Sequence, residues 1–377
     1  MKDYRNIFVK IAITIFDAIG WLLFFWLPKP QVDPTKVKSL LILKFDRLGD
    51  TFLAEPTIKA LRQLFPKAEL TVACSPWNQA VLANNPAIDR LLPIFSMPDV
   101  QKNGWLDFFS RPQRKYLAYF IKTQEVDLAI DLQGNPLNVL AMFLSGVRRR
   151  IGFGPKIFSF LLTGRAYYRY NQPQSEIYFS LAKLLGYTGE LEQPQIYANP
   201  VEQNQAVSFI RDNSLNNFIV FHVGAGRSYR QWPIDNFAEL AQRLLAQYTS
   251  HQIVVIGGLD DDLLFDRLAS QIKAGDRLVN AADRLSIPAT YELIRRARLF
   301  VGNESGPGHL AAALGVPTVS LMNPWSGVNR WQARGPKVSY FYQQAHFCRG
   351  VGCHHKPCPN MAAITVDEVY QKASSLL

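Results

Sequence analysis

Short apolar runs alternate with helical patterns from Ser39 onward, and this alternation restricts the possible folds more than any other feature of the chain. In the first half it predicts strands at residues 40–43, 70–73 and 128–132 and a helix at 57–65. The second half restarts the pattern, with predicted strands at 218–221, 253–256, 299–301 and 318–321 and predicted helices at 234–248, 291–297 and 308–314. Such alternation is typical of α/β folds with parallel sheets built from strand–helix–strand units.

A length of 377 residues exceeds the size at which a single core keeps growing, so two domains are expected. Residues 190–200 contain Pro194 and Pro200 and are predicted to be the linker. We therefore expect two doubly wound domains, at 36–193 and 201–377, that face each other across a cleft. Open parallel sheets bind ligands outside the carboxyl ends of their strands, so those ends are expected to line the cleft.

The segment 7–27 is almost wholly apolar and long enough to span a bilayer, but Lys10, Asp17 and Gly20 interrupt it. A carboxylate near the middle of a spanning helix costs about 2.5 to 3.5 kcal/mol on insertion scales. The favoured interpretation of residues 1–30 is therefore a helix that lies in the membrane interface with Lys10 and Asp17 turned to water. A true span and a helix packed on the protein's own core are the alternatives.

Lysine and arginine number 41 against 30 aspartate and glutamate, which gives a net charge of +11 and favours anionic partners such as phosphorylated substrates or lipids. Nucleic acid is disfavoured, because the basic residues are dispersed and no nucleic-acid-binding motif is recognisable. The four cysteines form no disulfide framework and suit a reducing compartment, of which the cytoplasm is the simplest.

Asp50 is the candidate catalytic residue of the first half. It follows the first predicted strand and Gly49, and it precedes a predicted helix. The G-x-G-x-x-G pattern of dinucleotide-binding folds is absent at this position. At the end of a strand-to-helix loop, the Asp50 side chain is expected to point into the cleft. The alternative is that Asp50 only caps the helix that follows.

A glycine loop in the second half predicts a phosphate site. Gly224, Ala225 and Gly226 follow a predicted strand, and Arg230 comes shortly before a predicted helix. Flexible backbone and a nearby cation form a cradle for phosphate, and Arg230 can neutralise the charge on a departing diphosphate. A surface turn with an incidental arginine is the alternative.

Residues 302–317 give the strongest signal in the chain. Gly306 and Gly308 let backbone amides come close to a ligand, and the alanine-rich helix behind them offers its positive N-terminus to a phosphate. Glu304 suits the hydroxyl groups of a sugar or ribose. His309 is expected to contact phosphate or sugar, and a residue that merely begins the helix is the alternative.

Two clusters of potential metal ligands need separate interpretation. The acidic run 260–262 is predicted to begin a helix, where acidic side chains are stabilising, and Asp260 is assigned to a ribose rather than to a metal. Cys348, Cys353 and Cys358 have nearby histidines and loosely match zinc-ligand spacing. A zinc site and a reduced loop that merely packs are both kept as hypotheses.

The motifs above, with two more, resemble in kind and order those of the bacterial ADP-heptose:lipopolysaccharide heptosyltransferases. They are D-R-L-G-D-x-x-L-x-x-P from Asp46, D-L-x-x-D-L-Q-G-N at 127–135, R-x-G-F at 150–153, the glycine loop that ends in W-P, and N-E-S-G-P-G-H-L-A-A-A-L-G-V-P at 303–317. The resemblance covers nearly all of the chain from Ser39. It implies the GT-B architecture of two Rossmann-like domains, a nucleotide-sugar donor that is usually ADP-heptose, and no metal or other cofactor.

The resemblance also implies roles for single residues. Asp50 takes the place of the general base, and Arg230 takes the place of a phosphate-binding lysine, with the same charge but a different donor geometry. The implied donor-binding loop consists of Glu304, Ser305, Gly306, Pro307, Gly308 and His309. The predicted phosphate cradle at Gly224, Ala225 and Gly226 and the predicted ribose contact of Asp260 complete the candidate donor-binding residues. The implied acceptor-binding residues are Arg47, Gln133 and Asn135.

Taken together, these features predict an inverting glycosyltransferase that moves a heptose or a related sugar from a nucleotide sugar to a hydroxyl group. The expected acceptor is an anionic lipid-linked glycan, such as a lipopolysaccharide core, on the inner face of the cytoplasmic membrane. A nucleotide-sugar epimerase of the same architecture and a non-catalytic nucleotide-sugar-binding protein are the alternatives. Incubation with the donor alone separates the epimerase, because only that enzyme changes the sugar without an acceptor.

Overall fold

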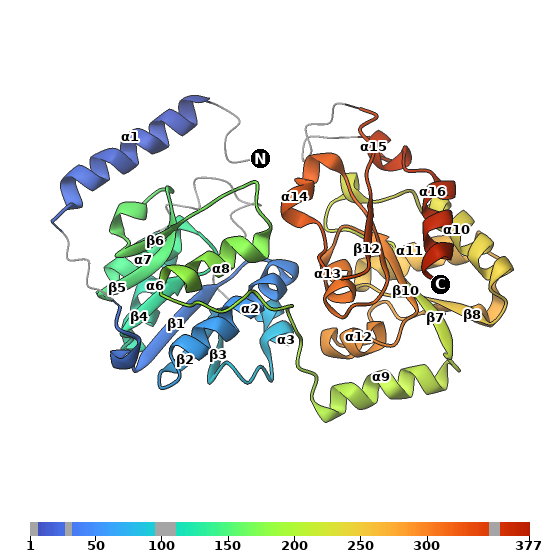
Figure 1. Cartoon of the computed structure of the whole chain (residues 1–377), viewed down its shortest axis with the longest axis horizontal. Helices are drawn as coiled ribbons and strands as arrows, with labels where there is room; N and C mark the ends of the chain where they lie inside the picture. Colours follow the sequence, from blue (N-terminus) through green and yellow to red (C-terminus); the bar gives the residue numbers. More distant parts are fainter. Residues whose placement is uncertain (1–6, 27–31, 95–110, 347–354) are drawn as a thin grey trace. The chain divides into compact units, whose positions relative to one another are not determined.

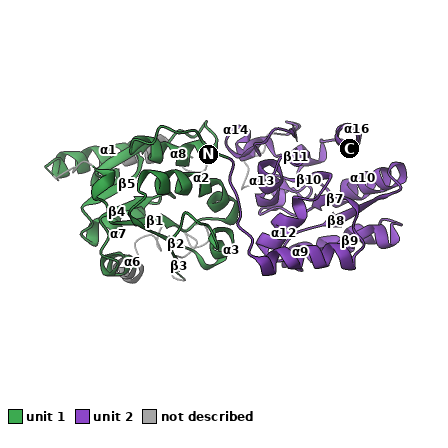
Figure 2. Cartoon of the chain, turned by 60° about the horizontal axis from the view of Figure 1, so that its bottom comes forward, with its two compact units in different colours: residues 1–192 green, residues 193–377 purple. Residues whose placement is uncertain are grey.

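The computed structural model describes residues 7–26, 32–94, 111–346 and 355–377. The chain divides into two compact units, Met1–Glu192 and Gln193–Leu377 (Figure 2). The division falls within the segment 190–200.

Unit 1 contains a parallel six-stranded sheet in the order β3-β2-β1-β4-β5-β6 (Figure 1). Its strands are β1 (Ser39–Lys44), β2 (Glu69–Cys74), β3 (Arg90–Pro93), β4 (Leu128–Asp131), β5 (Arg149–Gly154) and β6 (Gly164–Tyr167). Its helices are α1 (Ile7–Phe24), α2 (Leu48–Leu64), α3 (Gln79–Leu82), α6 (Arg111–Thr123), α7 (Pro136–Leu144) and α8 (Gln174–Leu184).

Unit 2 repeats this plan with the strand order β12-β11-β10-β7-β8-β9. Its strands are β7 (Asn217–His222), β8 (His251–Val255), β9 (Leu278–Asn280), β10 (Leu299–Asn303), β11 (Thr318–Leu321) and β12 (Val338–Phe341). Its helices are α9 (Pro200–Asp212), α10 (Ile234–Gln247), α11 (Leu259–Ala269), α12 (Ile287–Ile294), α13 (Gly306–Ala313), α14 (Val328–Trp331), α15 (Pro359–Ala362) and α16 (Val366–Leu376). The predicted α/β class with two doubly wound parallel sheets is confirmed.

Each sheet reverses its strand order at one point. In unit 1 the chain moves outward from β1 to β2 and β3, and then returns to place β4 on the other side of β1. Unit 2 does the same around β7 and β10. Loops that leave two such neighbouring strands diverge in opposite directions, which opens a crevice at the carboxyl edge of the sheet. The fold therefore marks the ends of β1 and β4, and of β7 and β10, as the places for a ligand.

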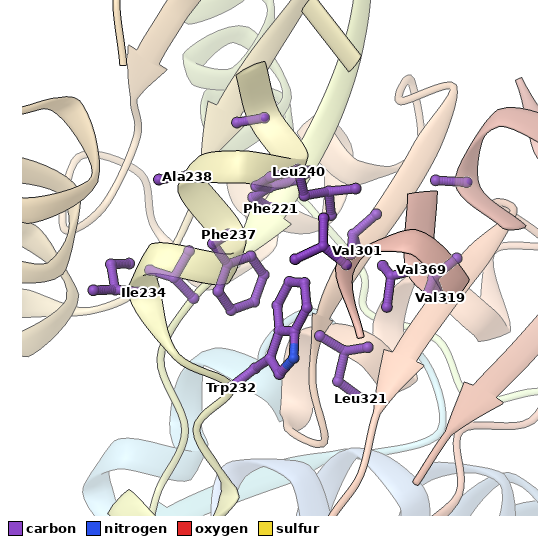
Figure 3. Close-up of a cluster of buried hydrophobic side chains, with 14 of the residues drawn as sticks. Phe221, Trp232, Ile234, Phe237, Ala238, Leu240, Val301, Val319, Leu321 and Val369 are labelled. Carbon is purple, nitrogen blue, oxygen red and sulfur yellow. The ribbon is translucent and has the colours of Figure 1, made fainter. Parts of the chain in front are cut away.

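Trp232 lies at the centre of the core of unit 2 (Figure 3). Its ring meets Phe237 of α10 edge to face, with centroids 4.9 Å apart, and its Nε1 donates to the carbonyl of Ile364 at 2.9 Å. The indole thus joins the start of α10 to the segment that precedes α16, and it fixes the end of the loop that carries Arg230.

Helix α1 packs against unit 1 through one face. Asp17 was expected to face water, and this expectation is wrong: its side chain is buried and accepts a hydrogen bond from Ser159 Oγ at 2.9 Å. Burial raises the pKa of Asp17, although the bond from Ser159 opposes the shift. Gly20 lies against the ring of Phe160, where a Cβ atom would overlap with it, and Phe24 stacks on Phe160 with centroids 5.3 Å apart. Within the described residues, none of the helices combines the length and hydropathy that crossing a membrane would require.

We expect Trp232→Ala to lower the free energy of unfolding of unit 2 by about 3 to 5 kcal/mol, because it removes a large buried ring and leaves a cavity. Urea denaturation followed by circular dichroism measures the change. Leu263→Ala is the matched control, since Leu263 is 70% exposed on α11 and its truncation is expected to cost less than about 0.5 kcal/mol. Equal losses in the two variants would contradict the central role of Trp232.

Candidate active site

Asp50 lies in the first turn of α2, the helix that follows the central strand β1. Arg47, and not Asp50, occupies the N-cap position of this helix. The Asp50 Oδ1 atom instead accepts a hydrogen bond from the hydroxyl group of Tyr178 on α8, at 3.1 Å. A carboxylate held in this way at the crevice between β1 and β4 can take a proton from a hydroxyl group of a ligand.

A buried ion pair lies next to Asp50. Lys44, the last residue of β1, is fully buried, and its Nζ atom lies 2.8 Å from Asp46 Oδ2 and 3.6 Å from the centroid of the Tyr178 ring. Burial raises the pKa of Asp46 to about 6; the Lys44 ammonium opposes this shift, and the Asp50 carboxylate adds to it. The Tyr178 hydroxyl lies 3.4 Å from Asp46 Oδ2, so it stands between two carboxylates.

Sequence reasoning missed the parts that Lys44, Asp46 and Tyr178 play. Asp46 lies within the motif that singled out Asp50, and its spacing from Lys44 puts both side chains at the end of the same strand. Tyr178 gave no signal, because it is 128 residues from Asp50 in sequence and only the packing of α8 beside α2 brings it close.

The three predicted acceptor-binding residues follow β1 and β4, which are neighbours in the sheet. Arg47 is exposed. Gln133 accepts a hydrogen bond from Asn138 Nδ2 at 3.2 Å, and Asn135 caps α7 by accepting from the amide of Leu137 at 3.0 Å. These residues share the carboxyl edge of the sheet with Asp50, and their contact with an acceptor stays a prediction.

In unit 2, one buried side chain holds together the loops that follow β7 and β10. Asn303 is fully buried, and its Nδ2 atom donates to the carbonyls of Val223 at 2.8 Å and Gly224 at 3.1 Å. Its Oδ1 atom accepts from the amide of Trp232 at 2.9 Å. The amide group of Asn303 therefore fixes the beginning and the end of the segment that contains Arg230.

Arg230 and Glu304, which were assigned separately, form an ion pair. The Arg230 guanidinium lies 3.0 Å from Glu304 Oε2, and the Glu304 side chain is 6% exposed while that of Arg230 is 20% exposed. Because the pair is largely removed from water, its attraction is weakly screened. The pair places one cation and one hydrogen-bond acceptor together at the crevice between β7 and β10.

Helix α13 begins at this crevice. Ser305 occupies its N-cap position but makes no side-chain hydrogen bond to the helix; its hydroxyl lies 3.0 Å from His222 Nδ1 and donates to the carbonyl of Asn303. The first-turn amides, including that of Gly308, therefore keep their capacity to bind an anion. Burial lowers the pKa of His309 to about 4, so its imidazole is neutral near pH 7, and its contact with phosphate or sugar stays a prediction.

The glycine loop is shaped by an aspartate that the sequence analysis did not single out. Gly224 lies against the Asp261 carboxylate, and a Cβ atom at this position would overlap with it. Asp261 accepts from the amide of Gly258 at 2.8 Å and lies 3.9 Å from His222 Nε2. Burial lowers the pKa of His222, and Asp261 opposes the shift. Asp260 is exposed in the first turn of α11, and its contact with a ribose stays a prediction.

The structure describes only one of the three cysteines of the zinc hypothesis. Cys358 is fully buried, and its Sγ atom accepts a hydrogen bond from Asn323 Nδ2 at 3.3 Å. Cys348 and Cys353 lie outside the described residues. Among the residues that the structure does describe, no three potential metal ligands form a group that could hold an ion. The zinc hypothesis stays a prediction.

The sequence is similar to those of known glycosyltransferases. It is 24% identical over 298 residues to a putative glycosyltransferase of Haemophilus influenzae, covering 76% of this chain and 82% of that protein. It is 24% identical over 300 residues to lipopolysaccharide heptosyltransferase 2 of Escherichia coli, covering 76% of this chain and 83% of that protein.

Solved structures share the fold over almost the whole chain. A glycosyltransferase family 9 protein of Veillonella parvula aligns with a TM-score of 0.76 and 20% identity, over 92% of this chain and 98% of that one. The ADP-heptose lipopolysaccharide heptosyltransferase II of E. coli aligns with a TM-score of 0.72 and 20% identity, over 90% of this chain and 98% of that one. The expected GT-B fold is confirmed by these likenesses.

The model of glycosyltransferase family 9 (heptosyltransferase) matches residues 115–356, which is more than half of the chain. This match extends from α6 through the whole of the Arg230 and Glu304 region. With the motifs, the two doubly wound units and the site residues at their strand ends, it shows that the chain belongs to glycosyltransferase family 9.

Proposed function

We propose that this protein transfers a heptose, or a closely related sugar, from ADP-heptose to a hydroxyl group of a lipid-linked glycan like the lipopolysaccharide core. The transfer inverts the anomeric carbon and needs neither a metal nor another cofactor. The acceptor is presented at the inner face of the cytoplasmic membrane.

The observation that carries this proposal is the division of chemistry between the two strand-order reversals. The reversal in unit 1 holds a carboxylate, Asp50, and the reversal in unit 2 holds a cation, Arg230, with the start of helix α13. Proton removal from an acceptor and stabilisation of a leaving diphosphate are the two tasks of a metal-free sugar transfer. A solved E. coli heptosyltransferase with 19% identity and a TM-score of 0.65 is described with ADP-2-deoxy-2-fluoro heptose, which supports an adenine nucleotide donor.

In the proposed reaction, the acceptor hydroxyl loses its proton to the Asp50 carboxylate while its oxygen forms a bond to the anomeric carbon. Tyr178 keeps the carboxylate in place through its hydrogen bond to Oδ1. The bond between the anomeric carbon and the diphosphate oxygen breaks, and that oxygen keeps the electron pair. The reaction therefore requires the acceptor hydroxyl, beside Asp50, and the diphosphate, beside Arg230, to lie on opposite sides of the anomeric carbon.

The leaving nucleoside diphosphate is stabilised by Arg230 and by the first-turn amides of α13. Glu304 keeps the guanidinium in position and also offers acceptor oxygens to sugar or ribose hydroxyls. Arg47, Gln133 and Asn135 are assigned to the acceptor, and Gly224, Ala225, Gly226 and Asp260 to the donor.

Asp50→Asn is expected to lower kcat at least about 100-fold, because the amide cannot accept the proton, while the donor still binds. Release of ADP in the presence of EDTA and a heptose-deficient core glycan measures turnover, and thermal stabilisation by ADP-heptose measures donor binding. Asp33→Asn is the control, since Asp33 is an aspartate of unit 1 whose side chain is 42% exposed. Full activity of Asp50→Asn would reject Asp50 as the base, and formation of a new sugar from donor alone would reject a transferase in favour of an epimerase.

Tyr178→Phe is expected to lower kcat about 10-fold with little change in the donor KM, because the hydrogen bond that positions Asp50 is lost, together with the longer contact to Asp46. The ring is kept, so Lys44 keeps its contact with the aromatic face. Tyr187→Phe is the matched control, since it removes a hydroxyl that bonds Gln63 elsewhere in unit 1. Steady-state kinetics of the two variants decide the matter, and equal kcat values would show that Tyr178 does not position the base.

Arg230→Met is expected to lower kcat/KM for the donor about 100- to 1,000-fold, because the charge on the leaving diphosphate is no longer balanced. Arg230→Lys keeps the charge and is expected to retain more activity than Arg230→Met. Arg243→Met, which breaks a surface ion pair with Asp367 in the same unit, is the control. If Arg230→Lys were as inactive as Arg230→Met, charge would not be the property that matters.

A further inference from the structure

Helix α1 presents an apolar face that no other described element covers. The exposed side chains on it are Ile11, Ile15, Ile19, Leu22 and Leu23, and Phe25 and Trp26 are exposed directly after the helix ends. Ile11, Ile15, Ile19 and Leu22 recur at the helical spacing that places them on one stripe. Ile15 is 53% exposed and Leu22 is 73% exposed, so the stripe points away from unit 1.

The opposite face of α1 is fastened to unit 1. Asp17, Gly20 and Phe24 lie on this side and contact Ser159 and Phe160. At 100° per residue, the direction midway between Asp17 and Gly20 is nearly opposite to that of Ile15 and Leu22. Because the docked face is held by a buried hydrogen bond and by stacked rings, the helix cannot simply turn its stripe inward.

The outward stripe is not suited to water. Asp17 is the only charged residue between positions 11 and 26, and it is buried on the docked side. A helix on the surface of a soluble protein normally turns charged or polar side chains outward. A contiguous exposed apolar surface of this kind marks a site of contact with a membrane or another protein.

Charge favours a lipid membrane over a second copy of the chain. Residues 1–192 contain 24 of the 41 lysines and arginines but only 16 of the 30 acidic residues, so unit 1 carries +8 of the total charge of +11. Two copies that met through α1 would bring two such units together, whereas an anionic leaflet attracts them. Close to the helix, the Arg165 guanidinium lies 4.4 Å from the centroid of the Trp21 ring, as expected where aromatic rings and cations meet lipid headgroups.

Two elements that contact α1 carry exposed apolar side chains of their own. Leu144, at the end of α7, follows Phe143, whose ring contacts Phe24 edge to face. Tyr167, at the end of β6, lies on the same face of that strand as Arg165. Both side chains are exposed.

We propose that α1 lies in the plane of an anionic membrane, with the stripe from Ile11 to Leu22 inserted at the boundary between headgroups and acyl chains. The helix of 18 residues is about 27 Å long, which gives a contact along the surface rather than across it. The helix thus fixes unit 1 to the membrane through its docked face. This inference concerns binding to lipid alone and does not require the proposed transfer reaction.

The test is flotation of the full chain with vesicles that contain phosphatidylglycerol. Wild type is expected to float, and Ile15→Glu with Leu22→Glu is expected to lower the partition coefficient at least about 10-fold, because two charges enter the inserted stripe. Leu263→Glu, an equally exposed leucine on α11 of unit 2, is the matched control and is expected to float like wild type. Vesicles of phosphatidylcholine alone, or high salt, are expected to weaken binding.

Three results would overturn the inference: no flotation of wild type, equal flotation of the stripe variant, or equal loss in the Leu263→Glu control. Sedimentation without lipid tests the second occupant, since a wild-type dimer that the stripe variant abolishes would assign the stripe to a second copy instead. Thermal unfolding of the stripe variant is expected to match wild type because both positions are exposed. Turnover on a soluble acceptor is also expected to match, so failure of lipid binding and failure of the proposed transfer are separately visible.

Discussion

The reversal of strand order in each sheet is the constraint on which the rest of the site depends. The side chains of a parallel strand that is buried on both faces pack in the core. Reactive groups are therefore found in the loops that follow the ends of such strands. β1 and β4 are neighbours in one sheet, and β7 and β10 are neighbours in the other. In each pair, the loops that follow the two strands run in opposite directions. In unit 2, Asn303 holds the loop after β7 in place. Its side-chain amide binds the carbonyl of Val223 at the start of this loop and the backbone amide of Trp232 at its end.

Both sites keep charges in pairs. Lys44 with Asp46, and Arg230 with Glu304, are largely withdrawn from water, and removing ions from water costs more than their attraction commonly returns. Such pairs are therefore poor devices for stability alone. Each pair instead holds a polar group in place beside the residue or ligand that reacts. Because the group is already ordered, little conformational entropy is lost when the substrate binds.

Much of this arrangement could be predicted from sequence. Apolar runs predicted the central strands, and glycine-rich segments predicted the loops that follow them. The pattern predicted a helix at 57–65, whereas α2 begins at Leu48 and contains Pro56. The short strands β3, β6, β9 and β12 lacked a clear apolar run. The contacts of Tyr178 and Asp261 with the site, and the burial of Asp17, depend on tertiary packing between distant segments, which local patterns do not encode.

The buried ammonium of Lys44 restricts which substitutions evolution can make at the end of β1. The Lys44 side chain is fully buried, and its charge is compensated by Asp46 and by the face of the Tyr178 ring. Loss of Asp46 alone would leave the buried Lys44 ammonium without its anionic partner. Loss of Lys44 alone would leave the Asp46 carboxylate without its cation and next to the Asp50 carboxylate. Positions 44 and 46 are thus tied in their evolution, and descendants of this sequence are expected to exchange both residues or neither.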